Sequence, residues 1–413
     1  MNSSAGNFDV IVLGGGMVGA TVASLLARCA MTVAVVDHEE PAPFHGDSDV
    51  GLRVSAISPG SARILEQAGA WAGITRQRHC PYRSMQVEEA AQRGSLAWEA
   101  DSFGMERLGT IVENNLLVGS LWDMLRANPM VEAFCGSAWD DLQQDEQGVC
   151  LVLEGGERLE APLLIASDGA RSQAREALGV RQEVWEYNQR GLVAVVETQQ
   201  ANPGIAWQRF LEGGPLAYLP LHDGRSSIVW TLPEALAKTH LEMDDAEFIP
   251  ALAEAGHSWL GGPQRVGPRG AFPLTMRLSE TYTVGRVAML GDAAHAVHPL
   301  AGQGVNLGLA DAAALVECLL MPGPGERMDD LARRLTQWQR WRRSESELMA
   351  RGMHALHALF MAPGLSGLRG LGLRTVGRSW LARDFLIRHA AGVSRNAPRL
   401  ARGEPLKKLL RAA

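Results

Sequence analysis

Three glycines near the amino terminus have the spacing of a loop that binds phosphate groups. Gly14, Gly16 and Gly19 stand between an apolar run at residues 9–13 and a segment with helical spacing at residues 17–29. The first glycine permits a tight turn, the second lets the backbone approach a pyrophosphate, and the third lets helix and strand pack closely. Free N–H groups at the start of the helix attract phosphate. The pattern predicts a dinucleotide site; the alternative is a glycine-rich turn between packed elements.

A carboxylate completes this first motif. Asp37 ends a second β-rich run, about 20 residues after Gly16, where a βαβ unit places an acid beside the adenosine ribose. Its side chain is expected to accept hydrogen bonds from the ribose hydroxyls. Because NAD and FAD share the adenosine half, this motif leaves open which of the two binds.

Two later motifs favour FAD. Asp168 and Gly169 follow one apolar run, and Gly291 and Asp292 follow another. Ligands of α/β sheets bind at the carboxyl ends of strands. The ribityl chain of FAD needs an acceptor for its hydroxyls, and Asp292 at a strand end suits that need. Such Asp-Gly and Gly-Asp pairs taken singly are more typical of ordinary turns, so their order and strand context carry the interpretation.

A glycine-rich stretch follows the third motif and is expected to begin a helix. Glycines there allow a flat ring to approach the backbone, and the N–H groups of the helix start would face the pyrimidine edge of a flavin, where negative charge develops on reduction. The residues expected to hold the ring are Pro299, Gly302, Gln303, Gly304, Val305 and Asn306. His295 and His298 lie nearby, but a packed or hydrogen-bonded structural role is favoured for both. No acid–base catalyst is assigned.

The motifs must be positioned by an α/β fold in which the chain leaves and re-enters the nucleotide-binding domain. Segments between residues 185 and 274 are largely β-rich, and the pattern after residue 303 is almost wholly helical. We therefore predict three parts: a discontinuous Rossmann-like FAD-binding domain (1–81, 110–184 and 275–340), an inserted antiparallel-sheet substrate domain (82–109 and 185–274), and a C-terminal helical region (341–413).

Composition excludes several other classes. A chain of 413 residues with 46% hydrophobic residues can bury a large core. Its five cysteines form no C-x-x-C pair, which favours reduced core thiols over disulfides or a metal site. The first residues lack the basic and apolar pattern of a signal peptide, and no stretch approaches the roughly 20 apolar residues of a spanning helix. A cytoplasmic location is expected.

Charge is distributed unevenly along the chain. Net charge is −7, yet the segment from Arg340 to the end has 15 Lys/Arg against 4 Asp/Glu. A solvated helical face that docks on the acidic body is the favoured interpretation, and contact with an anionic membrane or an acidic partner is the alternative. An acidic chain without a recognisable nucleic-acid-binding motif is not expected to bind nucleic acid.

The basic region also contains apolar residues at helical spacing. Ordinary core burial is favoured for them, and a face that meets a membrane or partner is the alternative. The apolar residues are Leu348, Met349, Met353, Leu356, Leu359 and Phe360, beside Arg342, Arg343 and Arg351.

With these motifs the chain resembles the class A flavoprotein monooxygenases, the group of p-hydroxybenzoate hydroxylase, and within them the ubiquinone-biosynthesis hydroxylases. The resemblance covers nearly the whole chain, including residues 52–58, 108–114, 208–221 and 271–274, and is most specific from Gly291 to Gly308. It implies that Arg53 lies near the cofactor phosphates, Asn114 near the ribityl chain, and Asp168 and Gly169 in a groove shared by FAD and nicotinamide. Asp37 stands where this family usually has Glu, and Ser167 where it usually has Ala.

The resemblance also implies a reaction. NAD(P)H, a transient co-substrate, would reduce FAD, and a C4a-hydroperoxide formed with O₂ would hydroxylate the ring of a polyprenylated phenol or quinol in ubiquinone biosynthesis. A hydroxylase of small soluble aromatic compounds, a non-catalytic FAD-binding member of a biosynthetic complex, and a simple NAD-dependent dehydrogenase are the alternatives. Oligomeric state stays open, with a homo-oligomer among the options.

Overall fold

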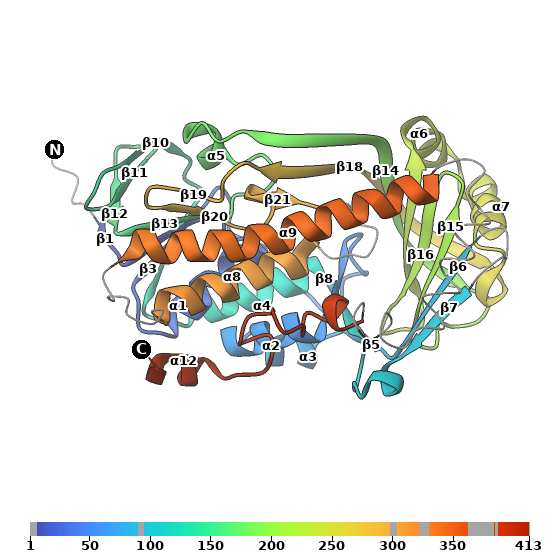
Figure 1. Cartoon of the computed structure of the whole chain (residues 1–413). Coiled ribbons are helices and arrows are strands. Elements are labelled where there is room, and N and C mark those ends of the chain that lie inside the picture. Colours follow the sequence, from blue (N-terminus) through green and yellow to red (C-terminus); the bar gives the residue numbers. More distant parts are fainter. Residues whose placement is uncertain are drawn as a thin grey trace.

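The structure is a computed structural model that describes residues 6–89, 95–297, 304–321, 330–361, 384 and 387–412. Figure 1 shows an α/β body at one end, a second sheet with two covering helices at the other, and one long helix that runs between them. This long helix is α9 (Leu331–Met361).

The α/β body is built on a six-stranded sheet with the order β19-β20-β13-β2-β3-β9. All of its neighbouring strands run parallel except β19, which pairs antiparallel with β20. The strands are β2 (Val10–Leu13), β3 (Val33–Asp37), β9 (Val131–Cys135), β13 (Leu163–Ala166), β19 (Thr283–Val284) and β20 (Val287–Met289). The predicted βαβ opening and the two later motif strands are thus neighbours in one sheet.

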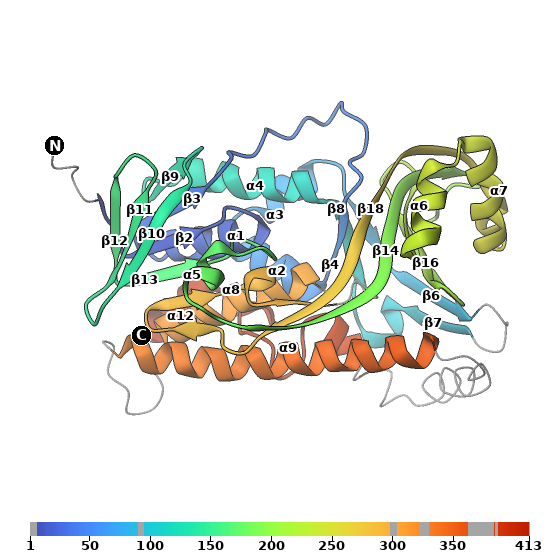
Figure 2. The same ribbon diagram turned by 90° about the horizontal axis from the view of Figure 1, so that it is seen from above.

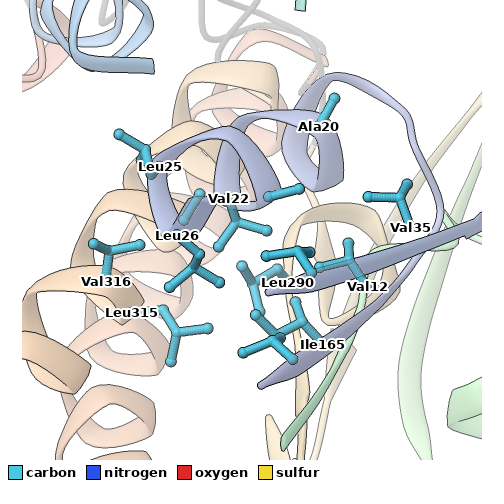
Figure 3. Packing of buried hydrophobic residues seen from close by; sticks show 14 of the residues in the cluster. Val12, Ala20, Val22, Leu25, Leu26, Val35, Ile165, Leu290, Leu315 and Val316 are labelled. Carbon is cyan, nitrogen blue, oxygen red and sulfur yellow. The ribbon is translucent and has the colours of Figure 1, made fainter. Parts of the chain in front are cut away.

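Helices surround this sheet, some packed on its strands and others on neighbouring helices. They are α1 (Met17–Ala27), α2 (Pro59–Ala68), α3 (Trp71–Arg76), α4 (Asn114–Arg126), α5 (Gln173–Ala177), α8 (Gly304–Leu320) and α12 (Leu406–Ala412). Figure 3 shows Val12 and Ile165 of the sheet facing Leu26 of α1 and Leu315 of α8, and all four are fully buried. Burying each such side chain contributes about 1.5–3 kcal/mol, so this contact holds the motif strands rigidly.

An eight-stranded sheet forms the second part, in the order β21-β18-β14-β17-β16-β15-β6-β7. Its strands are β6 (Ser84–Glu89), β7 (Ser95–Glu99), β14 (Gln182–Thr198), β15 (Ile205–Leu211), β16 (Gly214–Pro220), β17 (Ser226–Pro233), β18 (Pro263–Ser279) and β21 (His295–Ala296). Figure 2 shows the long strands β14 and β18 bending as they pass from the α/β body into this part.

Two features of this part differ from the expected antiparallel sheet. The pair β15–β6 is parallel, because the chain passes through the α/β body between these strands and no hairpin sets their direction. Two helices, α6 (Glu234–Glu242) and α7 (Asp245–Ala255), also lie within the segment predicted to be β-rich. They cover one face of the sheet through Ala237 of α6 and through Phe248 and Leu252 of α7.

Two smaller sheets complete the described elements. One has the order β4-β8-β5, from β4 (Val54–Ile57), β5 (Cys80–Tyr82) and β8 (Gly109–Glu113). The other has the order β1-β12-β11-β10, from β1 (Gly6–Asn7), β10 (Trp139–Gln144), β11 (Val149–Leu153) and β12 (Arg158–Ala161). The two helices predicted after residue 303 are observed as α8 and α9.

Only some side chains of the basic carboxyl-terminal region lie at the surface of the protein. Met353 is partly buried against the cluster of Val87 and Phe210, which agrees with the core burial favoured for the apolar residues. Arg342 is also buried, although it was interpreted as part of a solvated charged face. Leu348, by contrast, is 60% exposed. The side chains of Leu356, Leu359 and Phe360 lie outside those that the structure describes. Among the described helices, none combines the length and apolarity needed to cross a bilayer.

Candidate cofactor-binding site

The first motif forms a turn that only glycine can make at two of its positions. Gly14 has φ +89°, and a Cβ there would lie 2.5 Å from the Ser167 carbonyl oxygen. A Cβ on Gly19 would lie 1.8 Å from the Gly14 carbonyl oxygen, which confirms the predicted close packing of helix and strand. Around Gly16, by contrast, no atom lies within 4 Å of the Cβ position. The turn is therefore tightly packed on both sides of one open position.

Three side chains hold this turn from behind. The Asp37 carboxylate accepts a 2.6 Å hydrogen bond from the Gly15 amide, and the Trp122 indole donates one of 2.7 Å to the Gly15 carbonyl. The Ser167 hydroxyl lies 2.9 Å from the carbonyl oxygen of Gly14. Ser167, a departure from the family pattern, thus strengthens the contact between the first and second motifs. Trp122 carried no signal in the sequence beyond an apolar position in a helix.

The second motif leaves one carboxylate oxygen without a partner. Asp168 Oδ2 accepts a hydrogen bond from the Ala174 amide at 3.2 Å, while its Oδ1 is buried and accepts none. Gly169 has φ +83°, and its Cβ position faces open space. Since an unpaired buried carboxylate oxygen is costly, this atom is suited to receive a ligand's hydroxyl or amide.

Arg175 links the second motif to the third. Its guanidinium donates to the Ala170 carbonyl and to the Ala293 carbonyl, each at 3.2 Å. Burial lowers the pKa of Arg175, although Asp168 opposes the shift. This role was not predicted, because the sequence does not show that Ala293 lies beside Arg175.

The third motif rests on a buried charged cluster. Asp311 of α8 accepts hydrogen bonds from the Gly291 amide at 3.2 Å and pairs with His295 Nε2 at 2.6 Å and Arg342 Nε at 2.7 Å. Burial alone would raise the pKa of Asp311, but His295 and Arg342 outweigh it and lower this pKa. His295 therefore has the hydrogen-bonded structural role favoured from the sequence. Neither Asp311 nor Arg342 was among the predicted site residues.

Asp292 follows Gly291 directly and lies within the electrostatic reach of His295. Its side chain is exposed, yet the surrounding protein raises its pKa, an effect that His295 and Arg53 oppose. Arg53, at the start of β4, lies with its guanidinium 5.0 Å from the centre of the Phe272 ring. The structure thus brings Arg53 into the electrostatic neighbourhood of Asp292, although more than 200 residues separate them in the sequence.

The two asparagines predicted to bind the cofactor make different hydrogen bonds within the protein. Asn306 is buried, and its amide bonds the Ser58 amide and the Ala56 carbonyl, each at 2.9 Å, so its side chain ties α8 to β4. Asn114, at the start of α4, accepts a 2.7 Å hydrogen bond from Ser55.

Of the loop expected to hold the flavin ring, the structure describes only the part where α8 begins. Gly304 begins α8 with no atom within 4 Å of its Cβ position, and Val305 packs against the core. Pro299, Gly302, Gln303 and His298 lie outside the described residues.

No group of His, Cys, Asp or Glu suited to a metal ion occurs among the described residues. All five cysteines are free, as predicted. Cys318 is buried, Cys29, Cys80 and Cys135 are partly buried against apolar clusters, and Cys150 is partly exposed. Burial still raises the pKa of Cys29 and Cys80 to about 11, which keeps these thiols protonated at neutral pH.

Comparison with known proteins gives a consistent result. A family model described as "FAD binding domain" matches residues 7–346. The 3-demethoxyubiquinol 3-hydroxylase of Escherichia coli (strain K12) is 34% identical over 388 residues, covering 93% of this chain and 98% of that protein. Ubiquinone hydroxylase UbiL of Rhodospirillum rubrum is 33% identical over 404 residues, covering 96% of this chain and 93% of the relative.

Solved structures share the fold. PqsL, a probable FAD-dependent monooxygenase from Pseudomonas aeruginosa, superposes with a TM-score of 0.74 at 23% identity, covering 89% of this chain and 100% of PqsL. The p-nitrophenol 4-monooxygenase PnpA from Pseudomonas putida gives 0.73 at 20% identity, covering 94% and 98%. At these identities the likeness concerns the fold alone.

Proposed function

Because this chain belongs to the FAD-binding-domain family and is an FAD-dependent monooxygenase, we propose that it hydroxylates the aromatic ring of a polyprenylated phenol or quinol in ubiquinone biosynthesis. NAD(P)H and O₂ are its co-substrates. The substrate class follows the names of the relatives, which cover nearly all of this chain.

The convergence of three open glycine positions supports FAD as the cofactor. Gly16, Gly169 and Gly304 follow different strands of one sheet or begin the helix after it, and each has empty space at its Cβ position. The unpaired oxygen of Asp168 and the exposed carboxylate of Asp292 add acceptors beside them. Neighbouring parallel strands end at one edge of a sheet, so this pattern fits a long ligand that runs across that edge.

We assign the parts of FAD to these residues as follows. The pyrophosphate lies against Gly14, Gly16 and Gly19, with Arg53 nearby, and the adenosine ribose lies at Asp37. Asn114 and Asp292 hold the ribityl chain, and Asp168 with Gly169 lines the groove shared with nicotinamide. Gly291 and the α8 start, Gly304–Asn306, lie beside the ring. Asn306 contributes its backbone, since its side chain is engaged with β4.

Bound FAD would supply the redox chemistry: with two electrons from NAD(P)H, one atom of O₂ would be added to the ring and the other would leave as water. The chain itself positions the substrate and excludes water. The positive end of α8 stabilises negative charge that develops beside it.

Further features of this function are proposals of the same kind. The three predicted parts are retained as a proposal supported by the two large sheets, although α9 runs across the boundary at 340/341 and β21 joins the eight-stranded sheet from within 275–340. Contact with a membrane surface or a biosynthetic complex is proposed through the basic region 341–413, on the strength of its charge alone. A homo-oligomer is proposed without an assigned surface.

The test uses the purified protein. We expect a yellow preparation whose NAD(P)H oxidation increases when a short-chain prenylated phenol is added, with one ¹⁸O atom from ¹⁸O₂ in the product. Small soluble phenols provide the comparison, because preference for them would support the alternative substrate class. A flavoprotein that oxidises no NAD(P)H with either class would be a non-catalytic member of a complex.

A further inference from the structure

The eight-stranded sheet has one covered face and one face turned away from α6 and α7. On the covered face, Trp207, Tyr218 and Ile228 pack against Phe248 and Leu252 of α7. Side chains alternate along a strand, so their neighbours in sequence lie on the opposite face, which we call the inner face.

Strand pairing places one row of side chains across the inner face. Residues that pair directly project to the same side of a sheet. The pairs continue from strand to strand as Val87, Gln208, Ala217, Val229, Val193 and Gly270. The row ends on β14 and β18, the two strands that bend toward the α/β body (Figure 2).

This row ends at the cofactor site. A Cβ on Gly270 would lie 3.4 Å from Leu52 Cδ1, and Leu52 precedes Arg53. Two positions along the same strand, Phe272 contacts the Arg53 guanidinium. The inner face is therefore the wall of the sheet that meets the residues assigned to FAD.

Gln208 is the one polar side chain in this row. It is only 7% exposed. Its amide makes no hydrogen bond with any residue that the structure describes. The row is otherwise apolar, and its members Ala217 and Gly270 are small. The amide nitrogen and oxygen of Gln208 keep some accessible surface, so a ligand that reaches this face can pair with them.

We propose that Gln208 hydrogen-bonds an oxygen substituent of the aromatic substrate, and so selects rings that carry that substituent and fixes which carbon is hydroxylated. An amide can donate to one oxygen and accept from another, which matches a phenol that carries a hydroxyl beside a methoxy group. Sites built to pair a substrate hydroxyl reject analogues that lack it, because the protein group is then left unpaired. This inference rests on the proposed function and names the residue that recognises the substituent of the ring.

The decisive variant is Gln208→Leu, compared with Gln86→Leu. Gln86 pairs with Trp207 and therefore lies on the opposite face of the neighbouring strand. Two probes are used, a diprenylated methoxyphenol and the same compound without its ring hydroxyl. Binding is followed by the change in flavin absorbance, and turnover by kcat, KM and the position of the new hydroxyl.

We expect Gln208→Leu to keep its flavin and thermal stability while kcat/KM for the phenol falls about 10- to 100-fold, the range for an unpaired polar group. Discrimination between the two probes should disappear, and more than one ring position should be hydroxylated. Gln86→Leu should match the wild type. Equal losses for both probes would assign Gln208 a structural role, and no loss would remove it from the substrate site.

The wild-type protein separates this inference from the proposed function. If it binds only small soluble phenols, the prenylated substrate is wrong, and Gln208→Leu is then judged with a small phenol and its deoxy analogue. If it binds neither class of phenol, the proposed function and the role of Gln208 both fail.

Discussion

The first and third motifs both follow strands of one sheet and are both assigned to the proposed FAD site, but different forces hold them. Around Gly14 and Gly19 the backbone is fixed by contact, because added Cβ atoms would overlap carbonyl oxygens. Gly291 is instead held through Asp311, whose charge is balanced by Arg342 and whose carboxylate also pairs with His295. The first motif therefore depends on close packing and the third on a buried ion pair. Added side-chain volume should disrupt the first, and removal of a charge should disrupt the third.

The largest effect is expected from Asp311→Asn. It leaves Arg342 buried without its counter-charge, and breaking a buried pair costs about 3–5 kcal/mol of unfolding free energy. Urea unfolding of the apo-protein near neutral pH measures the loss. Asp292→Asn is the matched control: because the folded protein raises the pKa of Asp292, removal of that charge should not lower the stability of the apo-protein. A small loss in Asp311→Asn would mean that charge does not hold the third motif.

The same variant predicts a pH dependence. The pKa of Asp311 is lower in the folded protein than its ordinary value of 3.8, so its stabilising contribution is complete above that value and is lost as pH falls through the folded pKa. Wild-type stability should therefore decline in this acidic range more steeply than that of Asp311→Asn. Parallel slopes for the two proteins would contradict the assignment.

A second prediction tests shape at the first motif. Gly19→Ala forces a methyl group into the Gly14 carbonyl and should destabilise the apo-protein by about 3 kcal/mol, as severe overpacking does. Gly16→Ala adds the same methyl where no atom lies within 4 Å, so the fold should stay stable while FAD binding weakens. Thermal unfolding and FAD titration of both variants give the answer. Tight FAD binding by Gly16→Ala would remove the pyrophosphate from that position.

This contrast also explains what the sequence could predict. The turn at Gly14 and Gly19 depends on residues close together in the chain, so its spacing alone indicated the geometry. The cluster at Asp311 joins three segments that meet only in the fold. A single Asp in the apolar first part of an otherwise Ala- and Leu-rich helix was the available signal. Arg342 had none, since it stands among several arginines of a region interpreted as surface charge.

Short helices were missed for a related reason. In α6 only Ala237 is buried, so the segment shows little of the periodicity that marks a helix. The motif strands, which are buried on both sides, produced continuous apolar runs and were predicted correctly. Sequence patterns thus revealed the strands whose residues are all buried. They did not reveal a helix that buries only one side chain against the sheet.

A smaller effect is expected from Asp292→Ala. This variant tests FAD binding and leaves both the glycine turn of the first motif and the Asp311 cluster unchanged. Loss of an ionised acceptor should weaken FAD binding by about 1.5–3 kcal/mol, or roughly 10- to 150-fold. Fluorescence titration of the apo-protein with FAD measures this change, and the melting temperature of the apo-protein should not move. An unchanged dissociation constant would return Gly291–Asp292 to the role of an ordinary turn.

The smallest effect is expected from Trp122→Phe. This variant allows a direct comparison of the indole hydrogen bonds behind the first and third motifs. The Trp122 indole donates to the Gly15 carbonyl, and the Trp338 indole donates to the Asp311 carbonyl at 3.1 Å, so Trp338→Phe is the matched change at the third motif. The Asp311 carbonyl lies inside α8, where the helix supplies a second donor, whereas Gly15 precedes α1 and its carbonyl has no such helical partner. Trp122→Phe should therefore lower stability by about 1 kcal/mol and weaken FAD binding a few-fold, and Trp338→Phe should do less. Equal effects in FAD titrations would mean that the first turn is held by glycine packing alone and that the indole merely fills space behind it.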